Sequence, residues 1–293
     1  MPELPEVETV RLDLIKHLIG AQIDVIKIID LKNITPSAIF LLDFLPGQEV
    51  SSVRRKGKLL IIDLKNSDYH LLFHLKMTGQ LIFTNKKIKI AGGHSLDEGS
   101  SYKAVGGELP NKHTRAYFLF TNGARLFFND LRKFAYIKLV NRDELTEILL
   151  NNYGPEPLTP EFNLPYFKSI LKNRKRVIKA LILDQKLIAG LGNIYADESL
   201  FLAGIKPWKE GKALKSIEVE KLIVAINELI AEAIKYRGTT FRNYVDAEGK
   251  KGNFTTFLKV YGREGQACFN CGAKILKIKL VGRGTHYCAN CQK

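Results

Sequence analysis

The sequence predicts an α+β protein, with an N-terminal helix and antiparallel β-sandwich, then a helical domain, then a cysteine-rich β-hairpin. Short apolar runs separated by turns fill the first half of the 293 residues, and helical periodicity dominates afterwards. Two closely spaced cysteine pairs end the chain. The expected divisions are a sandwich over 1–150, a linker over 151–160, a helical domain over 161–265 and a finger over 266–293.

The first helix is predicted over residues 5–19. Pro5 is favoured at a first helical position, and Glu6 and Glu8 complement the positive end of the helix dipole. Gly20 is a typical stop. Apolar residues recur every three to four positions between them, so one face of this helix is expected to pack on a core.

Strands are predicted next, because alternating apolar runs are joined by short turns. Asn122-Gly123 is a typical hairpin turn, whereas the glycine-rich, polar stretch 85–112 predicts a long loop. Such a pattern favours an antiparallel sandwich or barrel. The strand-like runs are 22–31, 48–55, 58–64, 69–84, 113–120, 125–130 and 134–140.

After a proline-rich stretch, the strand-like pattern of the first half gives way to helical periodicity. Residues 151–160 follow no regular pattern and predict the linker. Helical periods are then found at about 164–172, 174–184, 193–202 and 216–236.

Charge is distributed unevenly between the two parts. The chain has 45 basic and 30 acidic side chains, a net charge of +15 and a pI near 9.5. Only +3 of this excess lies in residues 1–160, and +12 lies in the remainder. Such asymmetry favours a polyanionic partner, most often nucleic acid, over a merely basic soluble surface. The N-terminus has no signal-peptide pattern, so we expect a cytoplasmic protein.

Cys268, Cys271, Cys288 and Cys291 form two C-x2-C pairs separated by 16 residues. Four thiolates at this spacing complete a tetrahedron around one structural Zn²⁺ and leave no open catalytic position. Two disulfides are the alternative, which a reducing cytosol disfavours. Between the pairs, alternating apolar and lysine residues predict a β-hairpin with a basic tip, so the segment is a zinc-finger hairpin.

The N-terminus offers a candidate nucleophile. Removal of Met1 would expose the secondary amine of Pro2, which titrates far below lysine and can attack an aldehydic carbon to give an iminium ion. Glu3 and Glu6 beside it could transfer a proton or stabilise a cation. The alternative is that these residues merely begin a helix.

An ordered set of motifs spans nearly the whole chain. The motifs are MPELPEVETV at 1–10, GKLL at 57–60, HLKMTG at 74–79, DLRKF at 130–134, GLGNIYADE at 190–198, VYGREG at 260–265 and the cysteine finger. Through these motifs the chain resembles the formamidopyrimidine-DNA glycosylases, bacterial 8-oxoguanine repair enzymes. Leu4 favours this branch over the related endonuclease VIII-like enzymes, which act mainly on oxidised pyrimidines. That activity and a non-catalytic zinc-finger DNA-binding protein are the alternatives.

The resemblance implies a monomeric, bifunctional glycosylase/AP lyase acting on damaged double-stranded DNA. Pro2 would attack C1′, release the base and form a Schiff base, and β,δ-elimination would follow. Glu3 would assist proton transfer at the opening sugar, with Glu6 in support. Lys58 would contact a phosphate near the lesion and promote base excision, although a lysine in a turn is otherwise read as a solvated charge.

The resemblance also places Met77, Arg132 and Phe134 in the space left by the extruded nucleotide. Their chemistry suits this role, since Met is adaptable, Phe can wedge between base pairs and Arg can donate to the orphaned base. Burial of Met77 and Phe134 in a core is the alternative. Leu131 and Lys133 stand where the family more commonly has Pro and Arg.

Phosphate contacts are implied for Asn193, in a helix–two-turn–helix element, and for Arg283 in the finger. A loop feeding a helix N-terminus is a sequence-independent phosphate site, but Asn193 could also be a simple N-cap. Glu198 matches a motif acid to which we assign no role. The segment 239–254 corresponds to the family's loop over the extruded base, and the stretch 85–112 receives no function.

Overall fold

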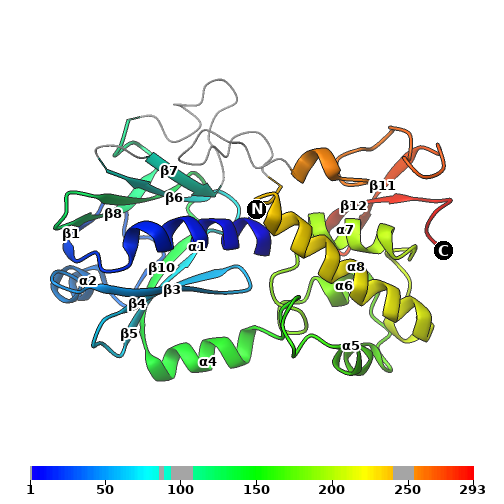
Figure 1. Ribbon diagram of the computed structural model, residues 1–293, viewed down its shortest axis with the longest axis horizontal. Helices are drawn as coiled ribbons and strands as arrows, with labels where there is room; N and C mark the ends of the chain where they lie inside the picture. The colour runs from blue at the N-terminus through cyan, green and yellow to red at the C-terminus, as the bar shows by residue number, and fades with distance from the viewer. Residues whose placement is uncertain (1, 86–88, 94–107, 240–253) are drawn as a thin grey trace. The chain divides into compact units, whose positions relative to one another are not determined.

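The computed structural model describes residues 2–85, 89–93, 108–239 and 254–293. The chain divides into two compact units (Figure 1). Unit 1 comprises residues 1–149 and 236–253, and unit 2 comprises residues 150–235 and 254–293. Residues 236–239 return to unit 1 because Arg237 forms an ion pair with Asp13 (2.6 Å) and the backbone N–H of Thr239 donates to Glu6 (2.7 Å).

Unit 1 contains two five-stranded sheets that pack face to face. Between them Phe73 makes edge contacts with Phe118 and Phe128 of the other sheet, with ring centroids 6.0 and 5.9 Å apart. The first sheet has the order β1 (Ile23–Ile28), β8 (Thr114–Phe120), β9 (Arg125–Asp130), β6 (Gly79–Thr84), β7 (Lys89–Gly93), and the second has the order β2 (Ile34–Thr35), β10 (Tyr136–Asn141), β5 (Tyr69–His74), β4 (Leu59–Leu64), β3 (Val50–Lys56).

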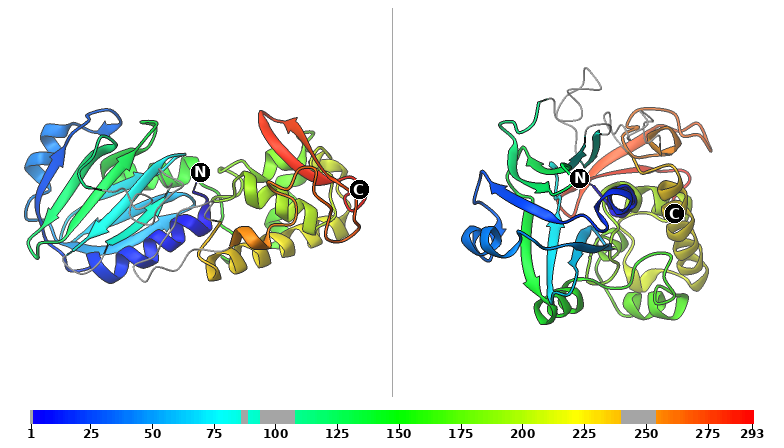
Figure 2. Two further views of the ribbon diagram at one scale, coloured as in Figure 1. Left: turned by 90° about the horizontal axis from the view of Figure 1, so that it is seen from above. Right: turned by 60° about the vertical axis from the view of Figure 1, so that its left-hand side comes forward.

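Helix α1 (Leu4–Leu18) confirms the first predicted helix to within one residue at each end. It packs against β3 and β7, the last strands of the two sheets, and so covers one open side of the sandwich (Figures 1 and 2). Its buried apolar face includes Val7, Val10 and Leu14, and each such side chain contributes about 1.5–3 kcal/mol when fully buried.

Three details of unit 1 differ from the sequence prediction. The run 69–84 is two strands, because residues 75–78 form a turn in which Lys76 is left-handed (φ 49°). Strand β7 lies within the predicted loop 85–112, where residues 86–88 and 94–107 are outside the described part. The sandwich is not wholly antiparallel, since β10 pairs with β2 in parallel.

Two helices were not predicted. Helix α2 (Ala38–Phe44) begins after Ser37, whose side chain accepts a hydrogen bond from the N–H of Phe40 (3.1 Å). Helix α4 (Arg142–Asn152) continues two residues into the stretch expected to be a linker.

Unit 2 is helical, as predicted, and ends in the hairpin. Its elements are α5 (Leu164–Leu171), α6 (Ile178–Ile182), α7 (Asn193–Leu202), η1 (Gly211–Ala213), α8 (Ser216–Lys235), η2 (Phe254–Phe257), β11 (Ile275–Leu280) and β12 (Arg283–Cys288). Helix α7 packs against α6, α8 and β12. The helix predicted over 174–184 starts only at Ile178, because Val177 is extended and bridges to Glu210.

The hairpin β11–β12 turns through Val281 (φ 44°) and Gly282 (φ 74°), and two positive φ angles suit the twist of a two-residue hairpin loop (Figure 2). Within the described ranges no helix is both long and apolar enough to cross a membrane.

Candidate functional site

The N-terminal segment is buried and ordered by a local hydrogen bond. Pro2 is buried, and Glu3, which is 2% exposed, is extended (φ −104°, ψ −170°) before α1 begins at Leu4. The backbone N–H of Glu3 donates to Oε2 of Glu6 at 2.8 Å. Residues Pro2, Glu3 and Glu6 therefore lie together at the start of α1, as the sequence predicts.

The second oxygen of the Glu6 carboxylate binds residues far away in sequence. Oε1 accepts hydrogen bonds from the backbone N–H (2.7 Å) and the hydroxyl (3.1 Å) of Thr239. A Cβ at Gly238, whose φ is +82°, would lie 2.5 Å from this oxygen, so the approach requires glycine. Glu6 thus joins the N-terminus to residues 238–239. The base-covering segment expected at 239–254 otherwise lies almost wholly outside the described residues.

Lys58 follows a turn at Gly57, and the carboxylate of Glu8 on α1 holds this turn through Arg55. Gly57 is left-handed (φ 57°), and its carbonyl accepts a hydrogen bond from Nη1 of Arg55 (3.0 Å). Nε of Arg55 donates to Oε2 of Glu8 (2.9 Å). Lys58 is only 5% exposed, so its interpretation as a solvated charge is wrong. The pairing of Glu8 with Arg55 leaves no local signature in the sequence, because the two residues are 47 positions apart.

The two neighbouring arginines lower the pKa of the Glu8 carboxyl. Burial acts to raise the pKa, but hydrogen bonds and charge from Arg11 and Arg55 more than offset it, and the pKa is lowered overall. Glu8 is therefore ionised at neutral pH and holds both guanidinium groups.

His74, which lies in the motif at 74–79, is a further candidate that only the structure indicates. It ends β5, and its Nδ1 accepts a hydrogen bond from the backbone N–H of Lys76 (3.0 Å). Burial, followed by the charges of Lys76 and Lys58, lowers the pKa of His74 to about 3. The neutral ring therefore carries its proton on Nε2 and is a donor there.

Cations gather around the aromatic neighbour of this histidine. The Tyr136 ring lies 5.5 Å from the His74 ring, and the ammonium groups of Lys76 and Lys138 lie 5.4 and 5.3 Å from the Tyr136 centroid. A neutral N–H donor surrounded by lysines is suited to an anionic ligand such as a phosphate.

Met77, Arg132 and Phe134 form one exposed cluster, hereafter called the wedge. Met77 is 45% and Phe134 51% exposed, so the alternative that they are core residues is wrong. Nη1 of Arg132 donates to Sδ of Met77 at 3.0 Å, and the guanidinium lies 5.0 Å from the Phe134 centroid. The structure therefore brings together three residues that the sequence predicted to act together.

In unit 2, Asn193 binds the residue that follows Arg283. Gly192 is the N-cap of α7, so the interpretation of Asn193 as an N-cap is wrong. Asn193 donates instead from Nδ2 to the carbonyl of Gly284 (2.9 Å), the residue after Arg283. This bond fixes the start of β12 beside the N-terminus of α7, a favourable place for an anion.

A buried ion pair supports the same junction. Nζ of Lys179 and Oδ1 of Asp197 are 2.5 Å apart, and both side chains have zero exposure. Lys179 also donates to Oγ1 of Thr285 (2.7 Å), and Asp197 accepts the backbone N–H of His286 (2.8 Å). The pair therefore anchors β12 to helices α6 and α7. Neither residue was selected from sequence.

Glu198 has a structural role in this unit. Its carboxylate, 1% exposed, accepts three backbone N–H groups, from Lys259 (2.8 Å), Val260 (2.9 Å) and Tyr261 (2.7 Å). Burial raises the pKa of Glu198, and the three hydrogen bonds oppose that rise. Glu198 therefore orders the segment that leads into the finger.

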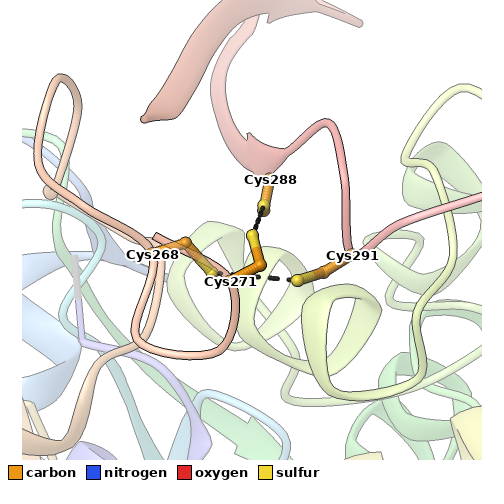
Figure 3. A group of neighbouring side chains, drawn as sticks. All are labelled: Cys268, Cys271, Cys288 and Cys291. Atoms are coloured by element: carbon orange, nitrogen blue, oxygen red, sulfur yellow. Dashed lines mark hydrogen bonds between the residues drawn. The ribbon is translucent and has the colours of Figure 1, made fainter. Parts of the chain in front are cut away.

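The four cysteines converge at the base of the hairpin (Figure 3). Their Sγ atoms all lie within 4.8 Å of one another, with 3.8 Å between Cys268 and Cys291 and 3.4 Å between Cys271 and Cys288. Sulfurs around a tetrahedral zinc ion are separated by about 3.8 Å, given Zn–S bonds of about 2.3 Å. These distances fit one structural zinc ion and are too long for disulfides.

Burial and the neighbouring thiols raise the pKa of Cys291. A group of four ionised sulfurs at this spacing therefore needs a cation, which Zn²⁺ provides.

Comparisons with known proteins agree along the whole chain. Residues 1–137 match the model of the formamidopyrimidine-DNA glycosylase N-terminal domain, residues 153–245 that of its H2TH domain, and residues 265–293 that of a zinc finger found in FPG and IleRS. Formamidopyrimidine-DNA glycosylase of Listeria innocua is 40% identical over 296 residues, covering 100% of both chains. The same enzyme of Rickettsia conorii is 41% identical over 293 residues, covering 100% of this chain and 99% of its own.

Solved structures give the same result. Lactococcus lactis Fpg, in complex with DNA that contains an abasic site, aligns with a TM-score of 0.85 at 35% identity and 99% coverage of both chains. MutM in complex with carbocyclic 8-oxo-G containing DNA aligns with a TM-score of 0.84 at 35% identity and 100% coverage of both.

Proposed function

The chain belongs to the formamidopyrimidine-DNA glycosylase family, and we propose that it removes 8-oxoguanine and formamidopyrimidines from duplex DNA as a bifunctional glycosylase/AP lyase. The full-length agreement with named enzymes of this family is the main support. The burial of Pro2 and Glu3 beside the start of α1 is a second support, because the proposed chemistry needs an amine and a carboxylate close together.

Pro2 is the proposed nucleophile. Its secondary amine adds to C1′ of the damaged nucleotide, and the glycosidic bond breaks as the base leaves with a proton. Ring opening gives an iminium ion between Pro2 and the sugar, with Glu3 transferring the proton at the ring oxygen. The iminium acidifies C2′, so loss of that proton expels the 3′ phosphate, and a second elimination expels the 5′ phosphate.

The remaining residues hold the DNA while the nucleotide is outside the helix. Base chemistry requires extrusion, and the wedge has the exposed apolar and cationic groups that can fill the space left behind. Lys58 is proposed to contact phosphate in unit 1, and Asn193 and Arg283 in unit 2. The structural zinc keeps the hairpin that bears Arg283 folded.

The protein is proposed to act on damaged double-stranded DNA as a monomer in the cytoplasm. Its net charge of +15 supports binding to the phosphate backbone without sequence readout.

Cleavage of two duplexes tests the substrate class. We expect single-turnover excision of 8-oxoguanine opposite cytosine to be faster than excision of thymine glycol by at least about tenfold, a difference of about 1.4 kcal/mol in transition-state binding. Preference for thymine glycol would favour the endonuclease VIII-like alternative. Binding with cleavage of neither would favour a non-catalytic DNA-binding protein.

A further inference from the structure

The loop 131–134, which bears two of the three wedge residues, is held from inside by Asp130. This carboxylate, 1% exposed, accepts the backbone N–H groups of Arg132 (3.2 Å), Phe134 (2.7 Å) and Ala135 (2.8 Å). The hydroxyl of Thr78, next to Met77, also donates to Asp130 and accepts the N–H of Arg132 (3.0 Å). The backbone on both sides of the wedge therefore converges on one buried group.

Lys133 lies between the wedge residues Arg132 and Phe134. Its backbone has a conformation that residues other than glycine seldom adopt. Its φ is +58°, in the left-handed region. Its carbonyl accepts a hydrogen bond from Nδ2 of Asn33 (2.7 Å), and its ammonium group pairs with Oδ2 of Asp30 (2.8 Å). Both ends of Lys133 are thus attached to the segment that follows β1.

Arg115 completes a closed ring of contacts. Its Nε and Nη2 donate to the carbonyl of Asp130 (2.9 and 2.6 Å), and its Nη1 donates to the same Asp30 oxygen (3.1 Å). Asp30 therefore receives one cation from Arg115 on β8, which holds the start of the loop, and one from Lys133 in the middle of the loop. The pKa of Asp30 is lowered by the hydrogen bond from Lys133 and by the backbone N–H of Lys32, so it stays ionised at neutral pH.

We propose that Lys133 is a positioning residue of the reaction: its ion pair with Asp30 holds Arg132 and Phe134 in the arrangement that reads the base opposite the lesion. The inference rests on the proposed function, in which the wedge enters the duplex. Lys133 exerts this effect through a contact within the protein, its ion pair with Asp30. Lys133 is 47% exposed in this pair, and exposed pairs contribute little to stability, so the pair can be removed without unfolding the domain.

Lys133→Met removes the ion pair while keeping an unbranched side chain at the same backbone position. The measurement is the single-turnover rate of 8-oxoguanine excision opposite cytosine divided by the rate opposite adenine. Loss of the pair frees Arg132 to adapt to either base, and we expect the ratio to fall about fivefold, the size typical of coupling between contacting residues. Lys133→Arg, which can still reach Asp30, restores the ratio.

Lys65→Met is the matched control, because Lys65 also forms an exposed ion pair in unit 1, with Glu49 at 2.9 Å. It removes the same charge and should leave the ratio unchanged. Asp30→Asn should lower the ratio in the same direction, and the double variant Asp30→Asn/Lys133→Met should lower it no further than the larger single change. An unchanged ratio in Lys133→Met, or an equal fall in Lys65→Met, overturns the proposal.

A second substrate separates this proposal from the proposed function. An abasic site has no base to extrude, so borohydride trapping of Lys133→Met on an abasic duplex should stay within about twofold of the unsubstituted protein. A matching loss of trapping would instead indicate damage to the reaction centre and would overturn the positioning role. If the unsubstituted protein neither excises 8-oxoguanine nor is trapped, the proposed function itself fails.

Discussion

Arg55 on β3 donates from Nε to Oε2 of Glu8 on α1 over 2.9 Å, and the two side chains are only 11% and 14% exposed. The same guanidinium holds the carbonyl of Gly57. One ion pair thus joins the helix that begins two residues after Pro2 to the turn that precedes Lys58. The proposed nucleophile and the proposed phosphate contact depend on the same junction.

Arg55→Met should therefore weaken both the fold and base excision. Removing one partner leaves the Glu8 carboxylate largely buried with less compensation, and we expect the free energy of unfolding to fall by about 2–3 kcal/mol. Displacement of Lys58 should slow excision of 8-oxoguanine about tenfold. Urea unfolding and single-turnover cleavage measure the two effects.

Arg54→Met is the control for this prediction. Arg54 is the neighbouring residue and also pairs with a carboxylate, Asp63, but it is 47% exposed. Its loss should cost less than about 1 kcal/mol. Equal effects of the two substitutions on excision would contradict a special role for the Arg55 junction.

His74 should remain neutral throughout the physiological pH range, because its pKa is lowered to about 3. Nitrogen–proton correlation spectra should show the Nε2–H tautomer from pH 8 to pH 5 without titration. A midpoint near pH 6.5, the ordinary value for histidine, would refute this assignment.

The same shift makes stability depend on pH. Below the unfolded-state pKa near 6.5 the unfolded chain binds a proton that the folded chain refuses, so this contribution is complete above pH 6.5 and is lost as the pH falls toward 3. Between pH 7.5 and 5.0 the loss amounts to about 2 kcal/mol. The free energy of unfolding of His74→Gln, measured at both pH values, isolates this contribution. The variant should lose less stability between the two pH values than the unsubstituted protein.

Lys179→Met should destabilise unit 2 strongly. Asp197, fully buried, would lose the ammonium group 2.5 Å away, at an expected cost of about 3–5 kcal/mol. DNA affinity should fall as well, since β12 and Arg283 lose their anchor. Lys209→Met, which breaks the more exposed pair with Glu218, should cost much less. Equal unfolding free energies for the two variants would contradict the anchoring role.

Cys288→Ala should abolish zinc binding and DNA binding together, because three ligands do not close the structural site. Zinc content per chain and filter binding to a duplex measure the two properties. Phe269→Ala is the control. Phe269 lies between the ligands Cys268 and Cys271 in sequence, but its ring is 63% exposed, so the variant should retain zinc. Retained zinc in Cys288→Ala would contradict the four-ligand assignment.

Local patterns predicted much of the fold. Helix α1 is predictable because its start, stop and apolar face are all encoded within residues 5–20. The pattern of residues 69–84 predicts one strand, because the turn at 75–78 depends on a left-handed lysine, Lys76, which has no turn signature. Helical periodicity predicts too long a helix at 174–184, because Val177 pairs instead with Glu210, a distant contact that competes with it.

In the candidate site, too, local patterns are predictable from the sequence and distant contacts are not. The cysteines are recognisable from their local spacing, and the wedge residues from the family motifs that the chain resembles. The pairs Glu8–Arg55, Asp30–Lys133 and Lys179–Asp197 are not, since each joins residues that only the fold brings together. Sequence therefore indicates the groups that are proposed to touch DNA, and structure adds the groups that hold them in place.

Pro2 is proposed to form the covalent bond to DNA, and all the proposed chemistry depends on that bond. Borohydride reduction on a duplex with an abasic site, followed by peptide mass mapping, is the direct test. We expect a chain without Met1 that is covalently attached to the sugar through the nitrogen of Pro2. We also expect no adduct when Pro2→Gly carries an N-terminal extension. An adduct mapped to a lysine, or an undiminished adduct in that blocked variant, would contradict the proposed role of Pro2.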